Sequence, residues 1–330
     1  MKILRCTAAA VVIFALAFTA FYGKTKIAES GVSALPAEYK GILTLWHIDT
    51  FEGGVGSRKQ FLMSMSRDFE KRNTGVLVMA TEHTVNSAKQ AFNEGKRPDL
   101  ISFGVGADVK DMRPLDIDLP AYGGIYGGVT YAVPWARGGY CVIENPDYVG
   151  NKKEKPPIIV SQGEYTNPLL AFLLSGKSET DFEILSPMDA YVKFVSGKVR
   201  YLLGTQRDIN RLYTRGMDFV SAPLNGYNDL YQYIAITSVD PVKAEYCQKF
   251  VKFILSDDIQ KNLHKIGMYS CYCRVEYDEP DMAAMQNAES GYFISAFSSA
   301  ELILDLQAKS RSAAAGNTGE LTEIKKLIVS

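Results

Sequence analysis

Residues 41–69 read GILTLWHIDTFEGGVGSRKQFLMSMSRDF and form the most informative stretch of the chain. The stretch opens with an apolar, strand-forming segment at Gly41–His47, and the glycine-rich loop Glu52–Gly56 follows. Ser57–Gln60 then has the spacing of a capping box, in which the first side chain caps a helix and the fourth reaches back. Apolar residues recur beyond it at helical spacing, at Phe61, Leu62, Met65 and Phe69. The stretch therefore predicts a strand, a glycine loop and an amphipathic helix, the first unit of an α/β fold.

The same alternation of strand and helix continues downstream. Val76–Ala80 and Asp99–Phe103 are short apolar segments typical of strands, and a helix that begins after Thr84 and ends at Gly95 separates them. Strands and helices that alternate at this rhythm predict parallel βαβ units with helices on both faces of a sheet.

A second lobe is predicted from residue 130 onward. Residues 130–144 (TYAVPWARGGYCVIE) are extended and interrupted by Pro134 and a glycine pair, so we expect the chain to cross between lobes here. A second capping box stands at Thr205–Asp208, the extended segment 229–237 is expected to return to the first lobe, and the chain is largely helical from Pro241. The predicted fold is α/β, with two mixed sheets flanked by helices and joined by hinge strands. Its expected division is lobe 1 at 41–135 and 225–330, and lobe 2 at 136–224.

The first 27 residues predict export. Lys2 and Arg5 precede Ala8–Tyr22, a run without charge, and this order is typical of a secretory signal, or of a signal-anchor if it is retained. The run is short for a membrane-spanning helix, which needs about 20 apolar residues. Residues 28–40 read as a linker. We therefore expect the folded body to work outside the cytoplasm, at the cell surface or in the periplasm.

Composition and motifs exclude several classes of protein. The formal net charge is −1 and there is no basic stripe, which argues against nucleic-acid binding. Three histidines are too few for a His-rich metal site, and no metal or cofactor is expected. There is no Gly-x-Ser-x-Gly or His-Glu-x-x-His pattern, and Gly176-Lys177-Ser178 lacks the earlier glycine of a phosphate-binding loop, because Ala171 stands there. We expect a protein that is not an enzyme.

Four cysteines follow the apolar N-terminal run: Cys141, Cys247, Cys271 and Cys273. Their spacing is neither a dense disulfide framework nor a Cys-x-x-Cys metal pattern. Cys247 lies on an apolar helix face, which predicts a place in the core. Cys271 and Cys273 are expected to be free or paired elsewhere, since a disulfide between residues two apart is geometrically awkward.

Five segments, in their order along the chain, resemble the family 1 extracellular solute-binding proteins of bacterial ABC importers. They are GILTLWH (41–47), RDFEKRNTGVLV (67–78), RPDLISFG (97–104), YAVPWARGGY (131–140) and AEYCQKFVKFILSDDIQKNLHKIGMYS (244–270). The resemblance covers about residues 41–275 and rests on the ordered set rather than on any single motif. It implies two α/β lobes of the periplasmic-binding-protein type that close on a ligand by hinge motion. It also implies delivery of that ligand to the permease subunits of an importer. We expect a monomer that meets the membrane through its N-terminal segment, although no lipid-acceptor cysteine follows the apolar run.

Ligand contacts are expected beyond the carboxyl ends of strands, where helix N-termini point free N–H groups at a ligand. In the first lobe this place lies between the strand at 41–47 and the helix that follows, and in the second lobe it lies after Gly204. Two further groups of residues flank the crossings between lobes. The candidate ligand-binding residues are Trp46, Asp49, Ser57, Arg58, Trp135, Arg137, Thr205, Gln206, Arg207, Tyr227 and Asp229.

The class of ligand stays open at this point. Trp46 and Trp135 are the two tryptophans of the chain, and their aromatic faces favour stacking on sugar rings. If Arg58, Arg137 and Arg207 converge, the ligand is instead anionic, because planar guanidinium groups hold carboxylate or phosphate with paired hydrogen bonds. We rank carbohydrate first, an anionic solute second, and a ferric site built from tyrosines a distant third. The alternative to transport is an exported ligand sensor that acts on a membrane kinase.

Overall fold

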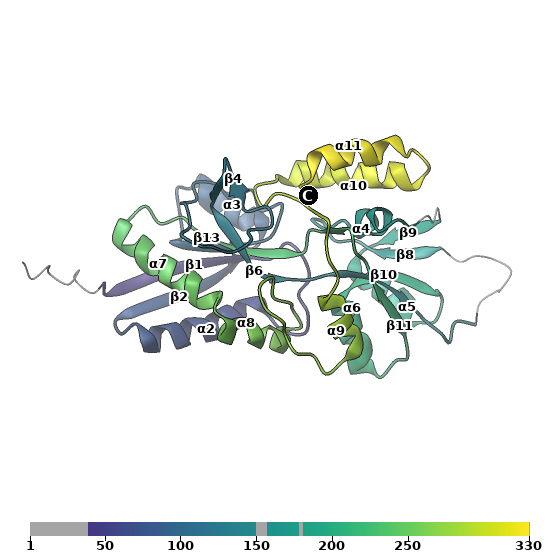
Figure 1. Cartoon of the computed structure of the whole chain (residues 1–330), viewed down its shortest axis with the longest axis horizontal. Coiled ribbons are helices and arrows are strands. Elements are labelled where there is room, and N and C mark those ends of the chain that lie inside the picture. The colour runs from purple at the N-terminus through teal and green to yellow at the C-terminus, as the bar shows by residue number, and fades with distance from the viewer. Residues whose placement is uncertain (1–38, 150–156, 178–180, 330) are drawn as a thin grey trace, which may run out of the picture. The chain divides into compact units, whose positions relative to one another are not determined.

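The computed structural model describes residues 39–149, 157–177 and 181–329. The chain divides into two compact units, Met1–Lys40 and Gly41–Ser330, and the elements described below belong to the second unit (Figure 1). The predicted signal segment and most of the predicted linker lie outside the described residues. In the part of the chain that is described, no helix combines the length and the apolar character needed to cross a membrane.

Five strands form the sheet of the first lobe. The order across the sheet is β2 (Val76–His83), β1 (Gly41–Ile48), β3 (Leu100–Phe103), β13 (Tyr231–Ile236) and β6 (Ala132–Arg137). Strands β1, β2 and β3 run parallel, as their alternation with helices predicted, and β13 runs antiparallel to both β3 and β6. The predicted return of segment 229–237 to the first lobe is thus confirmed, and the sheet is mixed.

Helices pack on this sheet through apolar faces that the sequence pattern marks. The helices are α2 (Arg58–Arg72), α3 (Val85–Asn93), α7 (Pro241–Ile254), α8 (Asp257–Gln260) and the short 3-10 helix η1 (Lys261–Ile266). Phe69 of α2 meets Phe250 of α7 edge to face, with ring centroids 5.2 Å apart. Cys247 of α7 is fully buried, as predicted from its apolar helix face.

The second lobe has a mixed sheet of its own. Its strand order is β11 (Val220–Pro223), β7 (Tyr140–Glu144), β10 (Tyr201–Thr205), β8 (Ile158–Ser161) and β9 (Phe182–Leu185). Strand β8 runs parallel to β9 and β10, whereas β7 runs antiparallel to β10 and β11. Three helices accompany these strands, namely α4 (Pro168–Leu174), α5 (Pro187–Val195) and α6 (Gln206–Arg215). Together with the first sheet, this arrangement confirms the predicted two-lobed α/β fold.

The two predicted capping boxes differ in the structure. At α6 both hydrogen bonds of the box are present. The Thr205 side chain accepts the backbone N–H of Asp208, and the Asp208 carboxylate accepts the backbone N–H of Thr205. At α2 the Oγ of Ser57 accepts the N–H of Gln60 at 3.3 Å, which is the N-cap half of the predicted box.

Three extended segments connect the lobes. The first joins β6 to β7 through Gly138, the second enters β13 through Leu230, and the third passes Tyr269. The Gly138 N–H donates to the Leu230 carbonyl at 2.7 Å, and Arg137 and Tyr269 exchange backbone hydrogen bonds of 2.9 Å. A side chain at Gly138 has no room, because an added Cβ would lie 2.7 Å from the Oε1 of Gln206. Adjacent extended crossings of this kind form the hinge about which such lobes move.

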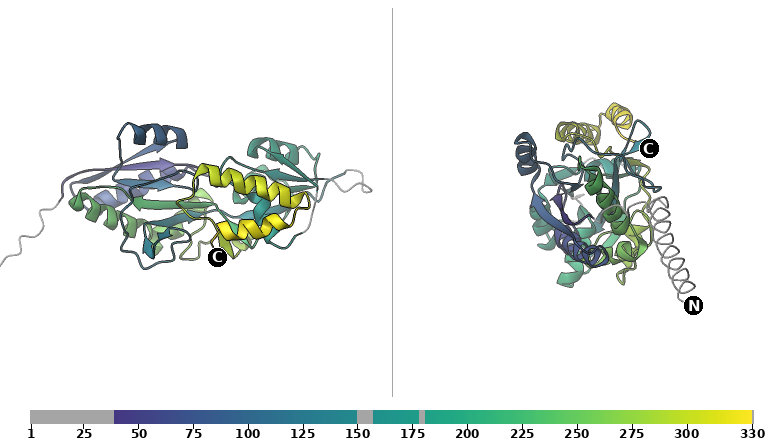
Figure 2. Two further views of the ribbon diagram at one scale, coloured as in Figure 1. Left: turned by 90° about the horizontal axis from the view of Figure 1, so that it is seen from above. Right: turned by 90° about the vertical axis from the view of Figure 1, so that its left-hand side faces the viewer.

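The last helices of the described chain are α9 (Pro280–Gln286), α10 (Ala300–Ala314) and α11 (Gly319–Leu327). The first two pack on the second lobe, and α11 packs on α10. Met282 and Met285 of α9 are fully buried in the core of the second lobe. Helix α10 packs on α4, and Figures 1 and 2 show α10 from two directions. The expected division placed residues 225–330 in lobe 1. That placement is corrected for α9 and α10, because their apolar side chains are buried against lobe 2.

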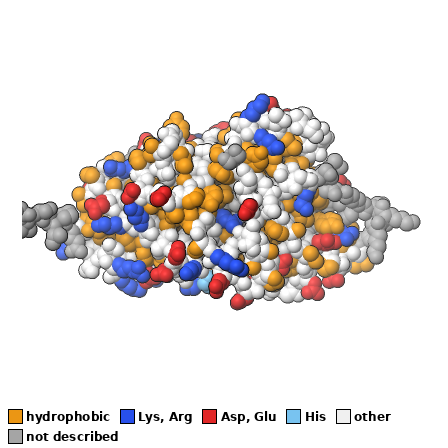
Figure 3. Space-filling view, viewed as in Figure 1, with side chains coloured by type: hydrophobic (Ala, Val, Ile, Leu, Met, Phe, Trp, Pro, Cys, Tyr) orange, Lys and Arg blue, Asp and Glu red, His pale blue; other side chains and the backbone are white. Residues whose placement is uncertain are grey.

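Two small sheets complete the described elements. Strand β12 (Tyr227–Asn228) pairs with β14 (Tyr292–Phe293), and β4 (Ile125–Tyr126) pairs with β5 (Val129–Thr130). On the face shown in Figure 3, acidic and basic side chains are interspersed with apolar ones and no continuous basic stripe runs across it.

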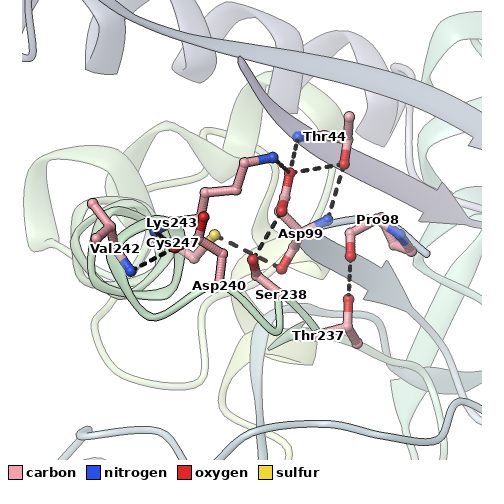
Figure 4. Close-up of polar contacts among 9 residues, drawn as sticks. All are labelled: Thr44, Pro98, Asp99, Thr237, Ser238, Asp240, Val242, Lys243 and Cys247. Atoms are coloured by element: carbon pink, nitrogen blue, oxygen red, sulfur yellow. Dashed lines mark hydrogen bonds and ion pairs between the residues drawn. The ribbon is translucent and has the colours of Figure 1, made fainter. Parts of the chain in front are cut away.

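Asp99 ties β1, β3, β13 and α7 together at one end of the first sheet (Figure 4). Its carboxylate accepts hydrogen bonds from the Thr44 N–H at 2.9 Å, the Ser238 hydroxyl at 2.9 Å and the Lys243 ammonium at 3.2 Å. Burial opposes ionisation here, but these donors outweigh it and hold the pKa of Asp99 below its ordinary value. Asp99 precedes β3, so this network lies at the amino end of that strand, away from the carboxyl ends where ligands bind. We assign it a structural role.

Candidate ligand-binding site

A cleft lies between the two lobes at the carboxyl ends of β1, β8 and β10. It encloses about 410 Å³, which is within the range of roughly 300–1,000 Å³ that is usual for small-molecule sites. The loop between β1 and α2 forms the wall of the first lobe, and the loops that follow β8 and β10 form the wall of the second. The lining residues are Asp49, Thr50, Phe51, Glu52, Gly53, Ser161, Gly163, Glu164, Tyr165, Thr166, Pro187, Thr205, Arg207 and Leu230.

Asp49 is held in place from behind by two buried side chains. Its Oδ1 lies 2.6 Å from a guanidinium nitrogen of Arg58 and 2.8 Å from Nε2 of His47. The side chains of Arg58 and His47 are 1% and 0% exposed, while that of Asp49 is 42% exposed. Burial by itself would raise the pKa of Asp49. The hydrogen bond from His47 and the charge of Arg58 together lower this pKa by more than burial raises it, so the net shift is downward. Asp49 therefore presents an ionised, preoriented carboxylate to the cleft.

The hydrogen bonds of Ser102 decide which nitrogen of His47 carries its proton. Ser102 Oγ accepts from Trp135 Nε1 at 2.9 Å and from Gln232 Nε2 at 3.0 Å. A hydroxyl has two acceptor lone pairs and one proton, so the remaining proton of Ser102 is donated to His47 Nδ1, 3.0 Å away. The proton of His47 is then on Nε2, which lies 2.8 Å from Asp49 Oδ1.

Ser102, His47 and Asp49 thus stand in the order of a hydrolytic triad, but the geometry serves a different purpose. The Ser102 side chain is fully buried and both of its lone pairs are occupied, so its oxygen has no path to a substrate. A nucleophilic serine needs an exposed oxygen beside the base that activates it. The chain of hydrogen bonds orients Asp49 and does not activate a nucleophile.

The two lobes touch across the cleft at two places. Arg207 Nε of the second lobe lies 3.2 Å from a carboxylate oxygen of Glu52 in the first. The ring of Tyr165 rests against Gly106, where an added Cβ would lie 2.6 Å from the ring, at a positive φ of 84°. A side chain at Gly106 would therefore push the lobes apart, so glycine there permits this degree of closure.

The sequence reasoning missed the loop Ser161–Thr166, which contributes five of the lining residues. Gln307 of α10 fixes this loop from behind, because its Nε2 lies within hydrogen-bonding distance of three carbonyl oxygens, those of Gly163 (3.2 Å), Glu164 (3.0 Å) and Thr166 (2.9 Å). The local signal was present: the apolar strand β8 is followed by a polar loop and by Asn167, which caps α4. This is the same strand-end and helix-start pattern that identified the other two loops.

Asp49, Thr205 and Arg207 are the predicted residues that line the cleft. Their contact with a ligand stays a prediction. Arg58 lies behind Asp49 and is 2% exposed, so it supports that carboxylate and has no surface for a ligand.

The structure places both tryptophans away from the cleft surface. Trp135 is fully buried, donates to Ser102 and stacks on Phe61 with ring centroids 5.7 Å apart. Side chains alternate along a strand, and Trp46 points to the face of the sheet that α3 covers. Its ring centroid lies 5.3 Å from that of Phe92 in α3. The expectation that tryptophan walls the cleft is corrected, because both rings are used to pack strands against helices.

The candidates Gln206, Tyr227 and Asp229 are all buried in the hinge. Gln206 is fully buried and its Oε1 accepts the Gly139 N–H at 2.9 Å. Asp229 is also buried and accepts from Tyr140 Oη at 2.5 Å, the Asn167 N–H at 2.8 Å and Tyr227 Oη at 3.2 Å. Burial raises the pKa of Asp229 to about 6. These side chains fix the crossing segments and offer no free surface to the cleft.

The last two candidates line other hollows. Ser57 lies at a separate surface pocket along α2. Arg137 lines a pocket beside Tyr231, and it donates to the carbonyl oxygens of Ser270 (3.3 Å) and Gln286 (2.5 Å). Arg58, Arg137 and Arg207 therefore do not converge on one point, as the anionic alternative required.

No group of three or more His, Cys, Asp or Glu side chains in the described part of the chain is arranged to hold a metal ion. The four described cysteines are free, including Cys271 and Cys273.

Comparison with known proteins gives a match at the level of fold. No family model matches the sequence, and no curated protein matches it either. The GacH receptor of Streptomyces glaucescens, solved without ligand and with acarbose, has a TM-score of 0.58 and 18% identity, with 88% of this chain and 99% of that chain covered. The sugar-binding protein MalE of Xanthomonas citri has a TM-score of 0.62 and 13% identity, covering 87% and 96%. Iron-bound HitA of Pseudomonas aeruginosa has a TM-score of 0.55 and 15% identity, covering 82% and 99%. The fold is that of the two-lobed periplasmic solute-binding proteins.

Proposed function

We propose that this protein is an extracytoplasmic solute-binding protein that captures a carbohydrate between its lobes and delivers it to an ABC importer. The observation that carries the proposal is the cleft itself, which joins an anchored carboxylate to polar and aromatic groups from the opposite lobe. The fold agrees, since solved structures of the same fold include a sugar-binding MalE and a receptor in complex with acarbose.

The chemistry of the cleft favours hydroxyl groups over a free anion. Asp49 and Glu164 line it from opposite lobes, and carboxylate oxygens accept charge-assisted hydrogen bonds from hydroxyl donors. Tyr165 supplies aromatic surface, which suits the apolar faces of a sugar ring. Asp49 and Glu52 are compensated by Arg58 and Arg207, at 2.6 and 3.2 Å, whereas no ion pair with a described residue compensates Glu164, so the cleft offers no unpaired cation to an anion centred in it.

Calorimetric titration with neutral mono- to tetrasaccharides tests the proposal. Glu164 is exposed in the cleft, and replacing it with alanine removes an acceptor that carries a full charge. We expect Glu164→Ala to weaken the best saccharide about ten- to hundredfold, since hydrogen bonds to charged groups contribute about 1.5–3 kcal/mol. Glu276→Ala is the matched control, because Glu276 is exposed and lines none of the pockets described. Wild-type affinity in Glu164→Ala, or no saccharide that binds, would refute the carbohydrate proposal.

The transport step requires a test in cells. Removal of this protein should abolish uptake of the saccharide that calorimetry identifies, and the protein should be found outside the cytoplasm. Normal uptake together with a lost transcriptional response would favour the sensor alternative instead.

A further inference from the structure

A second pocket adjoins the cleft on the other side of Arg207. It also encloses about 410 Å³ and lies between the loop after β1 and the helices α5 and α6. Arg207 lines both hollows, so the two adjoin at this side chain. The lining residues are Gly54, Val55, Met188, Tyr191, Arg207, Asn210, Arg211, Thr214 and Arg215, and none of them is acidic.

Three arginines of α6 supply the charge of this pocket. Arg207, Arg211 and Arg215 are spaced by four residues, which places them on one face of the helix. The guanidinium of Arg211 stacks over the ring of Tyr191, with its carbon 5.0 Å from the ring centroid, and is thereby held at the pocket wall. Arg215 is exposed, and no ion pair joins it to a carboxylate of the described residues.

The carboxylates nearby do not satisfy these guanidinium groups. Glu52 lies 3.2 Å from Arg207 and 3.9 Å from Arg211, but neither Arg207 Nε nor Arg211 Nη1 has a hydrogen-bond acceptor among the described residues although both atoms are buried. Asp208 lies 4.0 Å from Arg211, is fully buried and already accepts the Thr205 N–H at 2.9 Å. The side chains of Arg207 and Arg211 nevertheless stay 29% and 21% exposed, and this accessible part is what a ligand in the pocket can meet.

We infer that this pocket is an anion subsite continuous with the sugar cleft, and that the ligand is a saccharide bearing an acidic group, either a phosphate or a carboxylate. The inference rests on the proposed function and makes the ligand class narrower. The sugar lies against Asp49 and Glu164, and the acidic group reaches past Arg207 to the arginines of α6. Planar guanidinium groups hold both kinds of anion through paired hydrogen bonds. This arrangement separates the two halves of the ligand, since the carboxylates line the cleft and the arginines line the adjoining pocket.

The test compares matched saccharides by calorimetry. The panel holds neutral di- and trisaccharides, the same compounds with one carboxylate, the same compounds with one phosphate, and inorganic phosphate alone. We expect one acidic series to bind the wild-type protein about ten- to hundredfold more tightly than its neutral counterpart, with a preference that falls as salt is added. The series that shows the preference identifies the source of the anion.

Variants of α6 show whether the arginines cause the preference. In the double variant Arg211→Gln/Arg215→Gln, the ratio of acidic to neutral affinity should fall to about one. Arg200→Gln is the control, because Arg200 pairs with Glu144 at 2.7 Å and lines neither hollow, and it should keep the wild-type ratio. Melting without ligand shows that each variant is folded, and Arg211→Lys, which keeps the charge, should restore part of the preference.

The outcomes separate the two proposals. Neutral saccharides that bind as tightly as acidic ones, or a preference that survives the double variant, would overturn the anion subsite and leave the carbohydrate proposal standing. Inorganic phosphate that binds while every saccharide fails would overturn both, since the subsite is inferred as part of a saccharide site.

Discussion

Asp49 and Arg58 should behave as one energetic unit, and a double-mutant cycle can measure their coupling. Asp49→Asn removes the carboxylate charge and leaves the guanidinium of Arg58, 1% exposed, without its counter-ion. Arg58→Met removes the buried charge and keeps an apolar side chain of similar reach. The double variant has neither charge.

The expected magnitude follows from the unequal exposure of the two partners. Breaking a fully buried ion pair costs about 3–5 kcal/mol, whereas exposed pairs contribute at most about 1 kcal/mol. Since Arg58 is buried and Asp49 is 42% exposed, we expect Asp49→Asn to lower the free energy of unfolding by about 2–3 kcal/mol. In the Arg58→Met background the same change should cost less than about 1 kcal/mol, because no buried charge remains unpaired. The coupling energy is then about 2 kcal/mol, well above the error of additivity for independent sites.

Urea unfolding of the four proteins at neutral pH gives the four free energies. Asp68→Asn is the control, because Asp68 pairs with Lys71 at 2.7 Å on the exposed face of α2 and should change stability little. If Asp49→Asn costs as much in the Arg58→Met background as in the wild type, the two side chains are not coupled and the reasoning about Asp49 is wrong.

Three further predictions follow from the buried groups. Trp135→Ala should lower the free energy of unfolding by about 3–5 kcal/mol, as expected for a large core side chain, and urea unfolding that shows a loss of less than about 1 kcal/mol would contradict its place in the core. Gln307→Leu should weaken saccharide binding about tenfold, because three carbonyls of the loop Ser161–Thr166 lose their donor, and unchanged affinity would show that the loop holds itself. The pKa of Asp229 is raised from 3.8 to about 6, so the native state holds a proton that the unfolded state has released between these values. The stabilising contribution of protonated Asp229 is therefore present below about pH 4 and lost as the pH rises through 6. In urea unfolding, Asp229→Asn should lose less stability than the wild type over this pH interval. A steeper loss in the variant would contradict the assignment.

Local sequence patterns predicted most of the fold. The parallel strands at the start, the crossing between β6 and β7 and the cap of α6 were all predicted correctly, because each depends on residues within a few turns of one another. Hydrophobic period, glycine position and the spacing of Thr205 and Asp208 act through the local backbone, so they can be read without knowledge of neighbours in space.

The sites were harder, because a polar or aromatic side chain has several possible partners that lie far away in sequence. Trp135 looked like a cleft residue from its glycine-flanked setting, yet Ser102, 33 residues away, accepts its N–H within the core. Arg58 stands at a helix start that suggests ligand contact, but Asp49 and the ring of Phe51 hold it inward.

The position of the C-terminal helices shows the same division between local and distant information. Sequence pattern identified helices beyond Pro241, but it did not place Gln307 against a loop more than 140 residues earlier. Such a contact depends on which lobe offers an apolar groove for α10, and that is settled by the packing of both lobes together. Whether a residue faces the cleft or the core is likewise a property of the assembled lobes, because burial and pairing are shared between segments that local spacing does not connect.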